Sequence, residues 1–271
     1  LREIAPNYPD YNFLFTDVKD LDITNHKAVK EFVDSNSINV IINCAAYTAV
    51  DKAESDPELA DAINNLAVAN FAQIAKDKSI KLVHISTDYV FDGTNYKPYV
   101  ETDSPNPQSV YGQTKLDGEL AIKTINPLNS VILRTSWVYS KFGDNFVKTM
   151  LRLAETRDKL NVVADQIGTP TNAADLAKTI LIILPKIKND SVELYHYSNE
   201  GECSWHDFAI EIFEIKNIKI NVIPISTNDY KFKANRPLFS LLDKKKLKTK
   251  FNIEIPSWKE SLFSSILKFK F

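Results

Sequence analysis

The chain has 271 residues, of which 44% are hydrophobic and 25% charged, and its formal net charge is −2. Such a chain can bury one large core or two smaller ones, as globular proteins do. The near-neutral charge excludes the broad electrostatic attraction that general binding to nucleic acid or anionic membranes requires, so we expect neither partner.

The first residues predict an incomplete nucleotide-binding unit. Residues 1–6 are typical of the end of a helix stopped by proline. Residues 12–17 predict a strand that ends in Asp17, and an acidic residue at this position often holds a ribose hydroxyl in dinucleotide sites. None of the six glycines forms a G-x-G-x-x-G motif. We therefore expect that a strand and glycine-rich loop of roughly 15–20 residues precede Leu1 in the natural protein, and the alternative is a truly truncated protein.

Farther along, strands alternate with helices, which predicts a parallel sheet in an α/β domain. The hydrophobic pattern predicts helices at residues 26–35, 57–76 and from about 110, with strands at 40–46, 81–86 and 130–134. Residues 88–108 contain Gly93 and three prolines and predict a long loop, which is often functional inside a domain. His84 alternates with apolar neighbours and is interpreted as a core residue.

After about residue 140 the pattern is less regular. It predicts helices at 145–155, 173–184, 205–213, 243–248 and 258–268, and short strands at 160–163 and 194–197. Residues 204–207 are typical of a helix N-cap, and the basic run at 244–246 favours a solvated helix face. We predict a dinucleotide-binding domain at 1–140. Residues 141–271 then form mainly a substrate-binding lobe, with some segments returning to the first domain.

Cysteine and histidine usage predicts neither a disulfide framework nor a metal site. The two cysteines, Cys44 and Cys203, favour a reducing, cytoplasmic location. The four histidines show no metal-ligand spacing. No apolar run reaches the length of a transmembrane helix.

Tyr111 and Lys115 give the clearest chemical signal. Their spacing of four places both side chains on one face of a helix. An ammonium beside a phenol lowers the phenol pKa from its reference of about 10, and such a tyrosine can donate a proton to a carbonyl oxygen. Thr87, at the end of a predicted strand, can hydrogen-bond the same oxygen. The three residues suit carbonyl reduction by hydride transfer, although the spacing alone also fits a solvated helical pair.

Six motifs occur in order along nearly the whole chain: N-C-A-A-Y-T-A-V-D-K-A-E at 43–54, S-T-D-Y-V-F-D-G at 86–93, Y-G-Q-T-K at 111–115, R-T-S-W-V-Y at 134–139, D-Q-I-G-T-P-T at 165–171 and R-P-L-F-S at 236–240. Together they resemble the dTDP-4-dehydrorhamnose reductases, which are extended short-chain dehydrogenases/reductases. The resemblance implies a Rossmann-type doubly wound parallel sheet with a smaller, interleaved C-terminal α/β substrate lobe.

The resemblance also implies a reaction, the reduction of the C4 ketone of dTDP-4-dehydro-β-L-rhamnose to dTDP-L-rhamnose by NADPH or NADH. In it, Tyr111 is the general acid, Lys115 lowers its pKa and binds the nicotinamide ribose, and Thr87 polarises the carbonyl. The implied cofactor-binding residues are Asp17, Asp22, Ile23, Ala45, Ala46 and Tyr47, together with Tyr111 and Lys115. The implied substrate-binding residues are Thr87, Asp88, Trp137, Asn145, Phe146 and Arg236.

Several alternatives stay open. Asp22 also fits a helix cap, Trp137 a buried core residue, and Arg236 a surface ion pair. A non-catalytic, cofactor-binding regulatory subunit and another nucleotide-sugar reductase or epimerase share the fold, although the presence of all three catalytic groups favours an enzyme. The sequence leaves open the choice between NADPH and NADH, a homodimer, and a Mg²⁺ ion, which only the resemblance suggests.

Overall fold

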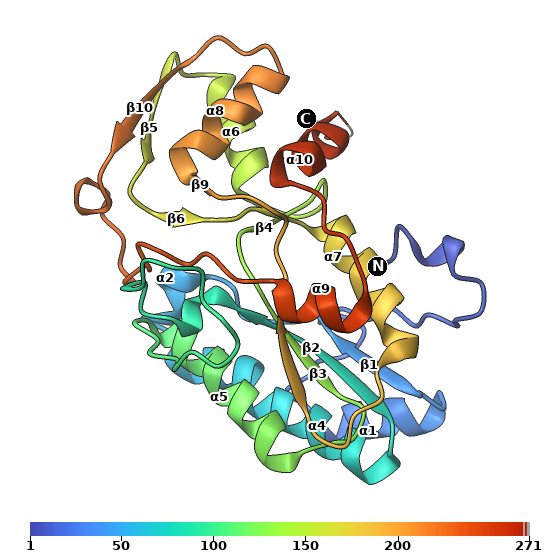
Figure 1. The fold of residues 1–271 in the computed structure, drawn as a ribbon. Coiled ribbons are helices and arrows are strands. Elements are labelled where there is room, and N and C mark those ends of the chain that lie inside the picture. The colour runs from blue at the N-terminus through green and yellow to red at the C-terminus, as the bar shows by residue number, and fades with distance from the viewer. Residues whose placement is uncertain (268, 270–271) are drawn as a thin grey trace.

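A computed structural model describes residues 1–267 and 269. Its centre is a four-stranded parallel sheet in the order β1 (Val40–Asn43), β2 (Lys81–Thr87), β3 (Val131–Thr135) and β8 (Glu193–His196). Figure 1 shows this sheet in the lower part of the molecule with helices on both sides. The predicted parallel α/β architecture is therefore confirmed.

Alternate residues of the strands supply two cores, because successive side chains point to opposite faces of a sheet. Leu82 and Ile132 pack on one face with α1 (His26–Ser35), α4 (Ala67–Lys78) and α5 (Val110–Ile125). Val83 and Leu133 pack on the other face with α7 (Ala173–Ile183) and α9 (Lys245–Phe251). Covering both faces explains why these strands are nearly continuous apolar runs.

The strand predicted at residues 12–17 is not formed. The segment carries no strand assignment, and none of the ladders in the described part of the chain includes it. Its apolar side chains still pack, since Phe13 contacts the core beneath α7 and α9. A strand needs a neighbour that accepts its backbone hydrogen bonds, and the apolar pattern alone does not provide one. Upstream, Ala5 N donates to Leu1 O, and a short 3-10 helix, η1 (Ala5–Asn7), contains Pro6.

The helix predicted at 57–76 is divided into α3 (Pro57–Asp61), a π-helical turn η2 (Ala62–Leu66) and α4. The turn packs against α5, and Gly118 of α5 lies so close to the Asn64 carbonyl that a Cβ would overlap it. The buried Asn64 side chain also bonds the backbone of Tyr47 and the Thr114 hydroxyl. Single π-turns inside helices often occur near functional sites.

The second lobe has its own core and a two-stranded parallel sheet, β5 (Lys159–Val163) with β10 (Asn221–Ile225). Around it pack α6 (Phe146–Ala154), α8 (Trp205–Ile215) and α10 (Trp258–Ile266). The capping box between Ser204 and Asp207 confirms the predicted start of α8. The last predicted helix ends at Ile266, and Lys268 lies outside the described residues.

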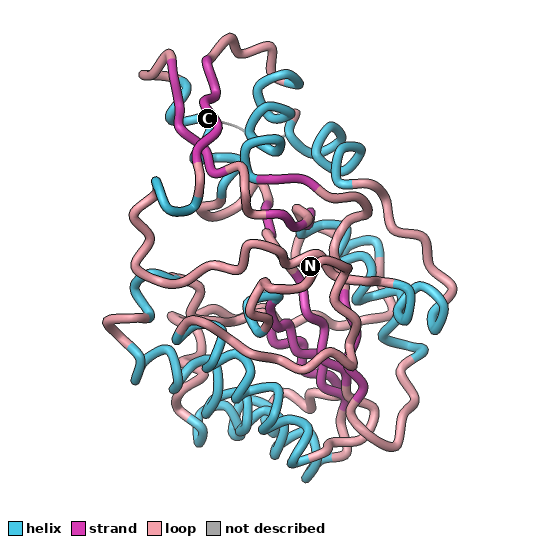
Figure 2. The backbone as a smooth tube through the Cα atoms, turned by 60° about the vertical axis from the view of Figure 1, so that its left-hand side comes forward, coloured by secondary structure: helices cyan, strands magenta, loops and turns pink. Residues whose placement is uncertain are grey.

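Segments of the C-terminal half return to the first sheet. Figure 2 shows the chain crossing between the two groups of strands several times. Two short ladders also form in these segments. In one, β4 (Val138–Tyr139) pairs with β7 (Thr171–Asn172), and in the other, β6 (Ile167–Gly168) pairs with β9 (Cys203–Ser204). The elements α7 and α9 pack on the large sheet, and β8 pairs with β3. The division near residue 140 stays a proposal that this interleaving supports.

Candidate functional site

A cavity of about 1030 Å³ opens at the carboxyl ends of β1, β2 and β3. It lies at the top of the roughly 300–1,000 Å³ range of ligand sites, so it has room for more than one small molecule. Ligands bind at this edge of open parallel sheets. Twelve of the predicted site residues line it: Asp17, Asp22, Ile23, Ala45, Ala46, Thr87, Asp88, Tyr111, Lys115, Trp137, Asn145 and Arg236.

The helix α5 carries Tyr111 and Lys115 into this cavity. It begins after Ser109, whose hydroxyl accepts a hydrogen bond from Gly112 N at 3.1 Å. Gly112 has no room for a side chain, because a Cβ would overlap the backbone oxygen of Tyr89. This close approach brings the first turn of α5 against the end of β2, where Thr87 is located.

Lys115 is only 1% exposed, so the interpretation as a solvated helical pair is wrong. Its Nζ donates to Ile85 O at 2.7 Å and lies 3.3 Å from His84 Nε2. Burial lowers the pKa of Lys115 to about 8, while Glu119 and Cys44 act in the opposite direction. A fully buried His84 agrees with its interpretation as a core residue, and the structure adds its contact with Lys115.

The expected lowering of the Tyr111 pKa is not found in this structure. Burial raises that pKa above its ordinary value, and the hydrogen bond with Thr87 opposes the rise only in part. The Nζ of Lys115 donates to Ile85 O rather than to the phenol. The Tyr111 side chain is therefore a protonated phenol at neutral pH, as a general acid must be before it reacts.

Asp88 follows Thr87 and is also buried. The Thr87 hydroxyl donates to Asp88 Oδ1 at 3.1 Å, and Oδ2 has no hydrogen-bond partner. Burial raises the pKa of Asp88 from 3.8 to about 6, although hydrogen bonds from Ser240 and Thr87 act against it. An unpaired carboxylate oxygen at the cavity wall is suited to accept a hydrogen bond from a sugar hydroxyl.

Behind these residues lies a buried ion pair. Arg134 of β3 donates from Nε and Nη2 to the two oxygens of Glu119 at 2.8 and 2.7 Å, and the Ser86 hydroxyl donates to the same carboxylate at 2.6 Å. Glu119 lies one helical turn beyond Lys115, and Ser86 directly precedes Thr87. The pair therefore joins the helix and the strand that carry the predicted catalytic residues. Sequence reasoning missed it, although the spacing from Lys115 to Glu119 was a signal.

On the predicted cofactor side, most of the expected residues line the cavity but Tyr47 does not. The Tyr47 hydroxyl donates to Asp56 at 3.2 Å. The Asn64 side chain accepts from Tyr47 N and donates to Tyr47 O, and these bonds keep the tyrosine ring in the protein interior. Asp22 does not cap α1; it accepts from Thr24 N and Oγ1 at 2.9 and 2.7 Å, and these bonds lower its pKa. The N-cap of α1 is Asn25.

On the predicted substrate side, Trp137 stacks on Trp205 with ring centroids 3.6 Å apart and planes inclined by 11°. Trp137 is half-buried and has a φ of +48°, a left-handed conformation that is rare for a bulky residue and is maintained only by its surroundings. Trp205 also lines the cavity. It was missed because residues 204–207 were interpreted only as a helix cap.

Asn145 and Phe146 have different positions. Asn145 lines the cavity and caps α6, since its Oδ1 accepts from Lys148 N at 3.2 Å. Phe146 does not line the cavity, and its ring packs on Trp205 and Phe208 in the core of the second lobe. Phe146 therefore supports the aromatic wall from behind.

Arg236 also lines the cavity and is held there by three groups. Its guanidinium donates to the Tyr89 hydroxyl at 3.0 Å and to Asp51 Oδ2 at 3.1 Å, and it lies 4.2 Å from the centre of the Phe232 ring. The Nε atom is buried without a partner. Arg236 does form an ion pair, but it also lines the cavity, where a guanidinium suits a phosphate oxygen.

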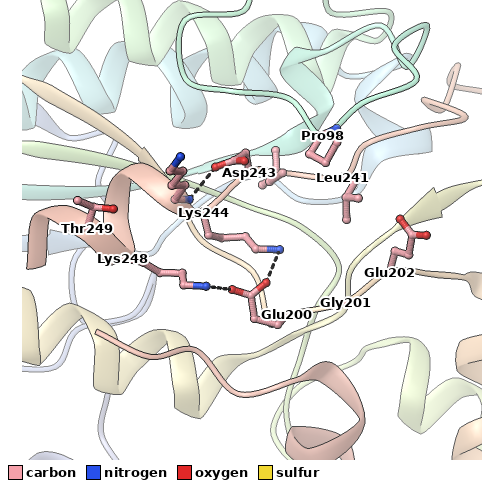
Figure 3. Close-up of a pocket in the computed structure, with 11 residues that line it drawn as sticks. Pro98, Glu200, Gly201, Glu202, Leu241, Asp243, Lys244, Lys248 and Thr249 are labelled. Atoms are coloured by element: carbon pink, nitrogen blue, oxygen red, sulfur yellow. Dashed lines mark hydrogen bonds and ion pairs between the residues drawn. The ribbon is translucent and has the colours of Figure 1, made fainter. Parts of the chain in front are cut away.

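A second cavity, of about 390 Å³, lies away from these residues (Figure 3). There Glu200 forms ion pairs with Lys244 at 3.4 Å and with Lys248 at 2.7 Å. The sequence pattern predicted that the basic run at 244–246 is a solvated helix face. Lys244 is only 7% exposed, so this prediction is wrong for that residue. Since Glu200 already compensates both lysines, we interpret this cluster as a structural contact of α9.

Within the described residues, no group of three or more histidine, cysteine, aspartate or glutamate side chains could hold a metal ion. The described residues therefore give no support to the Mg²⁺ ion that the resemblance suggested. In the same part of the chain, no helix is both long and apolar enough to cross a membrane.

A doubly wound parallel sheet, with a Tyr-x-x-x-Lys pair and a strand-end threonine at its carboxyl edge, defines the class of extended short-chain dehydrogenases/reductases. The RmlD substrate binding domain family matches residues 3–271. A dTDP-4-dehydrorhamnose reductase from Sinorhizobium fredii is 44% identical over 93% of this chain and 88% of its own length. The chain therefore belongs to the dTDP-4-dehydrorhamnose reductase family.

Solved structures agree. A dTDP-4-dehydrorhamnose reductase from Clostridium acetobutylicum superimposes with a TM-score of 0.92 at 44% identity and covers 98% of this chain and 94% of its own. The corresponding protein from Bacillus anthracis, in complex with NADP, gives a TM-score of 0.92 at 40% identity with the same coverage.

Proposed function

We propose that this protein reduces the C4 ketone of dTDP-4-dehydro-β-L-rhamnose to dTDP-L-rhamnose in nucleotide-sugar biosynthesis for cell-surface polysaccharides. The observation that supports this most is the position of Thr87, Tyr111 and Lys115 on one cavity, which Trp137 and Arg236 also line. Proteins about 44% identical to this chain carry the name of this activity.

In the proposed reaction, the nicotinamide supplies a hydride to C4 of the sugar. Tyr111 donates its phenolic proton to the C4 oxygen, so that one hydride and one proton convert the ketone to an alcohol. The Thr87 hydroxyl, which donates to Asp88 Oδ1 in this structure, turns to donate a second hydrogen bond to that oxygen. Lys115, one turn along α5, stabilises the phenolate left on Tyr111 when its ammonium turns from Ile85 O. Tyr111 then recovers its proton from solvent before the next turnover.

The remaining contacts assign binding roles. We propose that Asp17, Asp22, Ile23, Ala45 and Ala46 contact NADPH or NADH, because they line the cavity and the two alanines follow the carboxyl end of β1. Arg236 would bind the diphosphate, and Asp88, Asn145 and the Trp137–Trp205 stack would contact the sugar. A homodimer and a cytoplasmic location stay predictions. The two unpaired cysteines fit a reducing compartment.

The test is the oxidation of NADPH and NADH by the purified protein in the presence of the dTDP-keto-sugar. Tyr111→Phe should lower kcat by roughly 10²-fold or more while cofactor affinity is retained, because only the proton donor is removed. The control is Tyr96→Phe, a tyrosine that is 83% exposed. Near-normal kcat in Tyr111→Phe would exclude Tyr111 as the acid. Cofactor binding without turnover would favour the regulatory-subunit alternative, and turnover of only a different keto-sugar would favour another reductase or epimerase.

A further inference from the structure

The His84 ring lies between two hydrogen-bond donors. Its Nδ1 is 3.1 Å from Asn43 Nδ2, and its Nε2 is 3.3 Å from Lys115 Nζ. The ring is completely buried, and its pKa lies well below the ordinary value because of burial and the nearby lysine. His84 is therefore neutral, and a neutral imidazole has one N–H donor and one acceptor. It cannot accept a hydrogen bond from both neighbours.

The orientation of the Asn43 side chain decides which of the two neighbours donates to His84. Its Oδ1 accepts from Ala45 N at 3.0 Å, so the amide nitrogen must face the ring. His84 Nδ1 is then the acceptor, and the ring proton is on Nε2, directed at Lys115. Nζ of Lys115 meanwhile donates to Ile85 O at 2.7 Å. An uncharged amine has a lone pair that can accept a hydrogen bond from Nε2–H. An ammonium has three N–H donors and no lone pair, so it cannot accept this bond.

We propose that Asn43, acting through the His84 ring, controls the charge of Lys115, and that the arrangement in this structure favours the uncharged amine. Charging Lys115 moves the ring proton from Nε2 to Nδ1. Asn43 must then turn its amide so that the oxygen accepts from Nδ1–H, and it releases Ala45 N. Because Ala45 lines the cavity next to β1, the backbone of the predicted cofactor site is coupled to the charge of the predicted catalytic lysine.

The surroundings of Lys115 allow it to gain or lose its proton near neutral pH. Burial brings the pKa of Lys115 to about 8, and Glu119 of α5 and Cys44 after β1 oppose the fall. The other polar neighbours are Ile85 O and His84, both of β2. With the pKa of Lys115 this near neutrality, the direction in which the imidazole N–H points decides whether the amine or the ammonium prevails. Asn43 and His84 are positioning residues in this scheme, and its catalytic meaning rests on the proposed function.

The direct test is ¹⁵N NMR of the imidazole nitrogens in the purified protein, which distinguishes the two ring tautomers. There are four histidines, and the signals lost in His84→Gln identify His84. We expect the ring proton on Nε2 above the titration midpoint of Lys115 and on Nδ1 below it. A ring proton that stays on the same nitrogen through the whole titration would overturn the proposal.

Asn43→Asp reverses the polarity of the contact. Its carboxylate accepts from Nδ1–H, so the ring proton should stay on Nδ1 at every pH. The titration midpoint of Lys115, measured from the pH dependence of its acylation by mass spectrometry, should rise by about one unit or more. In a His84→Phe background, the same Asn43→Asp change should give less than half of that rise. An equal rise in both backgrounds would show a direct charge effect without the ring and would refute the proposal.

His196→Gln is the matched control, because His196 is an equally buried histidine on β8 of the same sheet, bonded to Tyr99 O rather than to a lysine. It should leave the midpoint of Lys115 unchanged. If Asn43→Asp does not fold, the tautomer measurement on the unaltered protein decides alone. A tautomer switch in a protein without reductase activity would refute only the proposed function, whereas full activity with a fixed tautomer would refute only this inference.

Discussion

The buried ion pair between Glu119 and Arg134 predicts how much the free energy of unfolding falls when one partner loses its charge. In Glu119→Gln the shape is kept, but the guanidinium of Arg134 loses its counter-charge inside the protein. Arg134 is 1% exposed and Glu119 0%, and Nη1 of Arg134 already has no partner. Removing one partner of a buried pair usually costs about 3–5 kcal/mol. Since glutamine keeps one acceptor, we expect the lower end, about 3 kcal/mol.

The assay is urea unfolding followed by circular dichroism, with thermal unfolding beside it. A loss of 3 kcal/mol corresponds to a fall in Tm of about 6–12 °C in a chain of this size. Glu211→Gln is the control, because Glu211 pairs with the exposed Lys259, and an exposed pair contributes about 0–1 kcal/mol. A Glu119→Gln variant no less stable than the Glu211→Gln variant would refute the reasoning. Replacing both partners, as Glu119→Leu with Arg134→Met, should recover most of the loss.

Three further predictions follow from other contacts. Asp88→Asn should increase the free energy of unfolding above pH 6. The pKa of Asp88 is raised from 3.8 to about 6 in the folded protein, so the folded state binds this proton more tightly than the unfolded state. The parent protein therefore loses up to about 3 kcal/mol of stability as the pH rises from about 4 to above 6. In urea unfolding the two proteins should converge below about pH 4. Lys115→Met should lower turnover and weaken NADPH binding together, and unchanged binding in calorimetry would exclude a ribose contact. Gly118→Ala should destabilise by about 1–2 kcal/mol despite the better helix former, because its Cβ meets the backbone oxygen of Asn64; an increase in Tm would contradict this.

The elements that the sequence predicted correctly are those whose signals are local. The helix at residues 26–35 matches the observed α1, because its apolar spacing and the polar cap lie in one segment. The capping box at Ser204 is equally local. The predicted strand at 12–17 is wrong because a strand also depends on a partner, which is not visible in the segment itself.

At the site, short motifs predicted which residues meet but not how each side chain points. Tyr47 follows a strand end, as expected of a cofactor contact, yet Asp56 and Asn64 hold it in the interior. The pKa of Tyr111 was predicted from the spacing to Lys115, whereas burial raises it and the hydrogen bond with Thr87 lowers it only in part. Such contacts join residues far apart in the sequence, and one sequence without its fold does not reveal them.

The position of β8 has a consequence for how the protein is made. Its residue Glu193 pairs with Val131 of β3, and Tyr195 pairs with Leu133, although the second-lobe segments α6 and β5 lie between the two strands in the sequence. A ribosome must therefore deliver the chain as far as His196 before the large sheet can be completed. Until then the edge of β3 is unpaired and open to association with other chains. Parallel pairing across so many residues is intrinsically slow, so newly made chains spend time in a form that chaperones can bind.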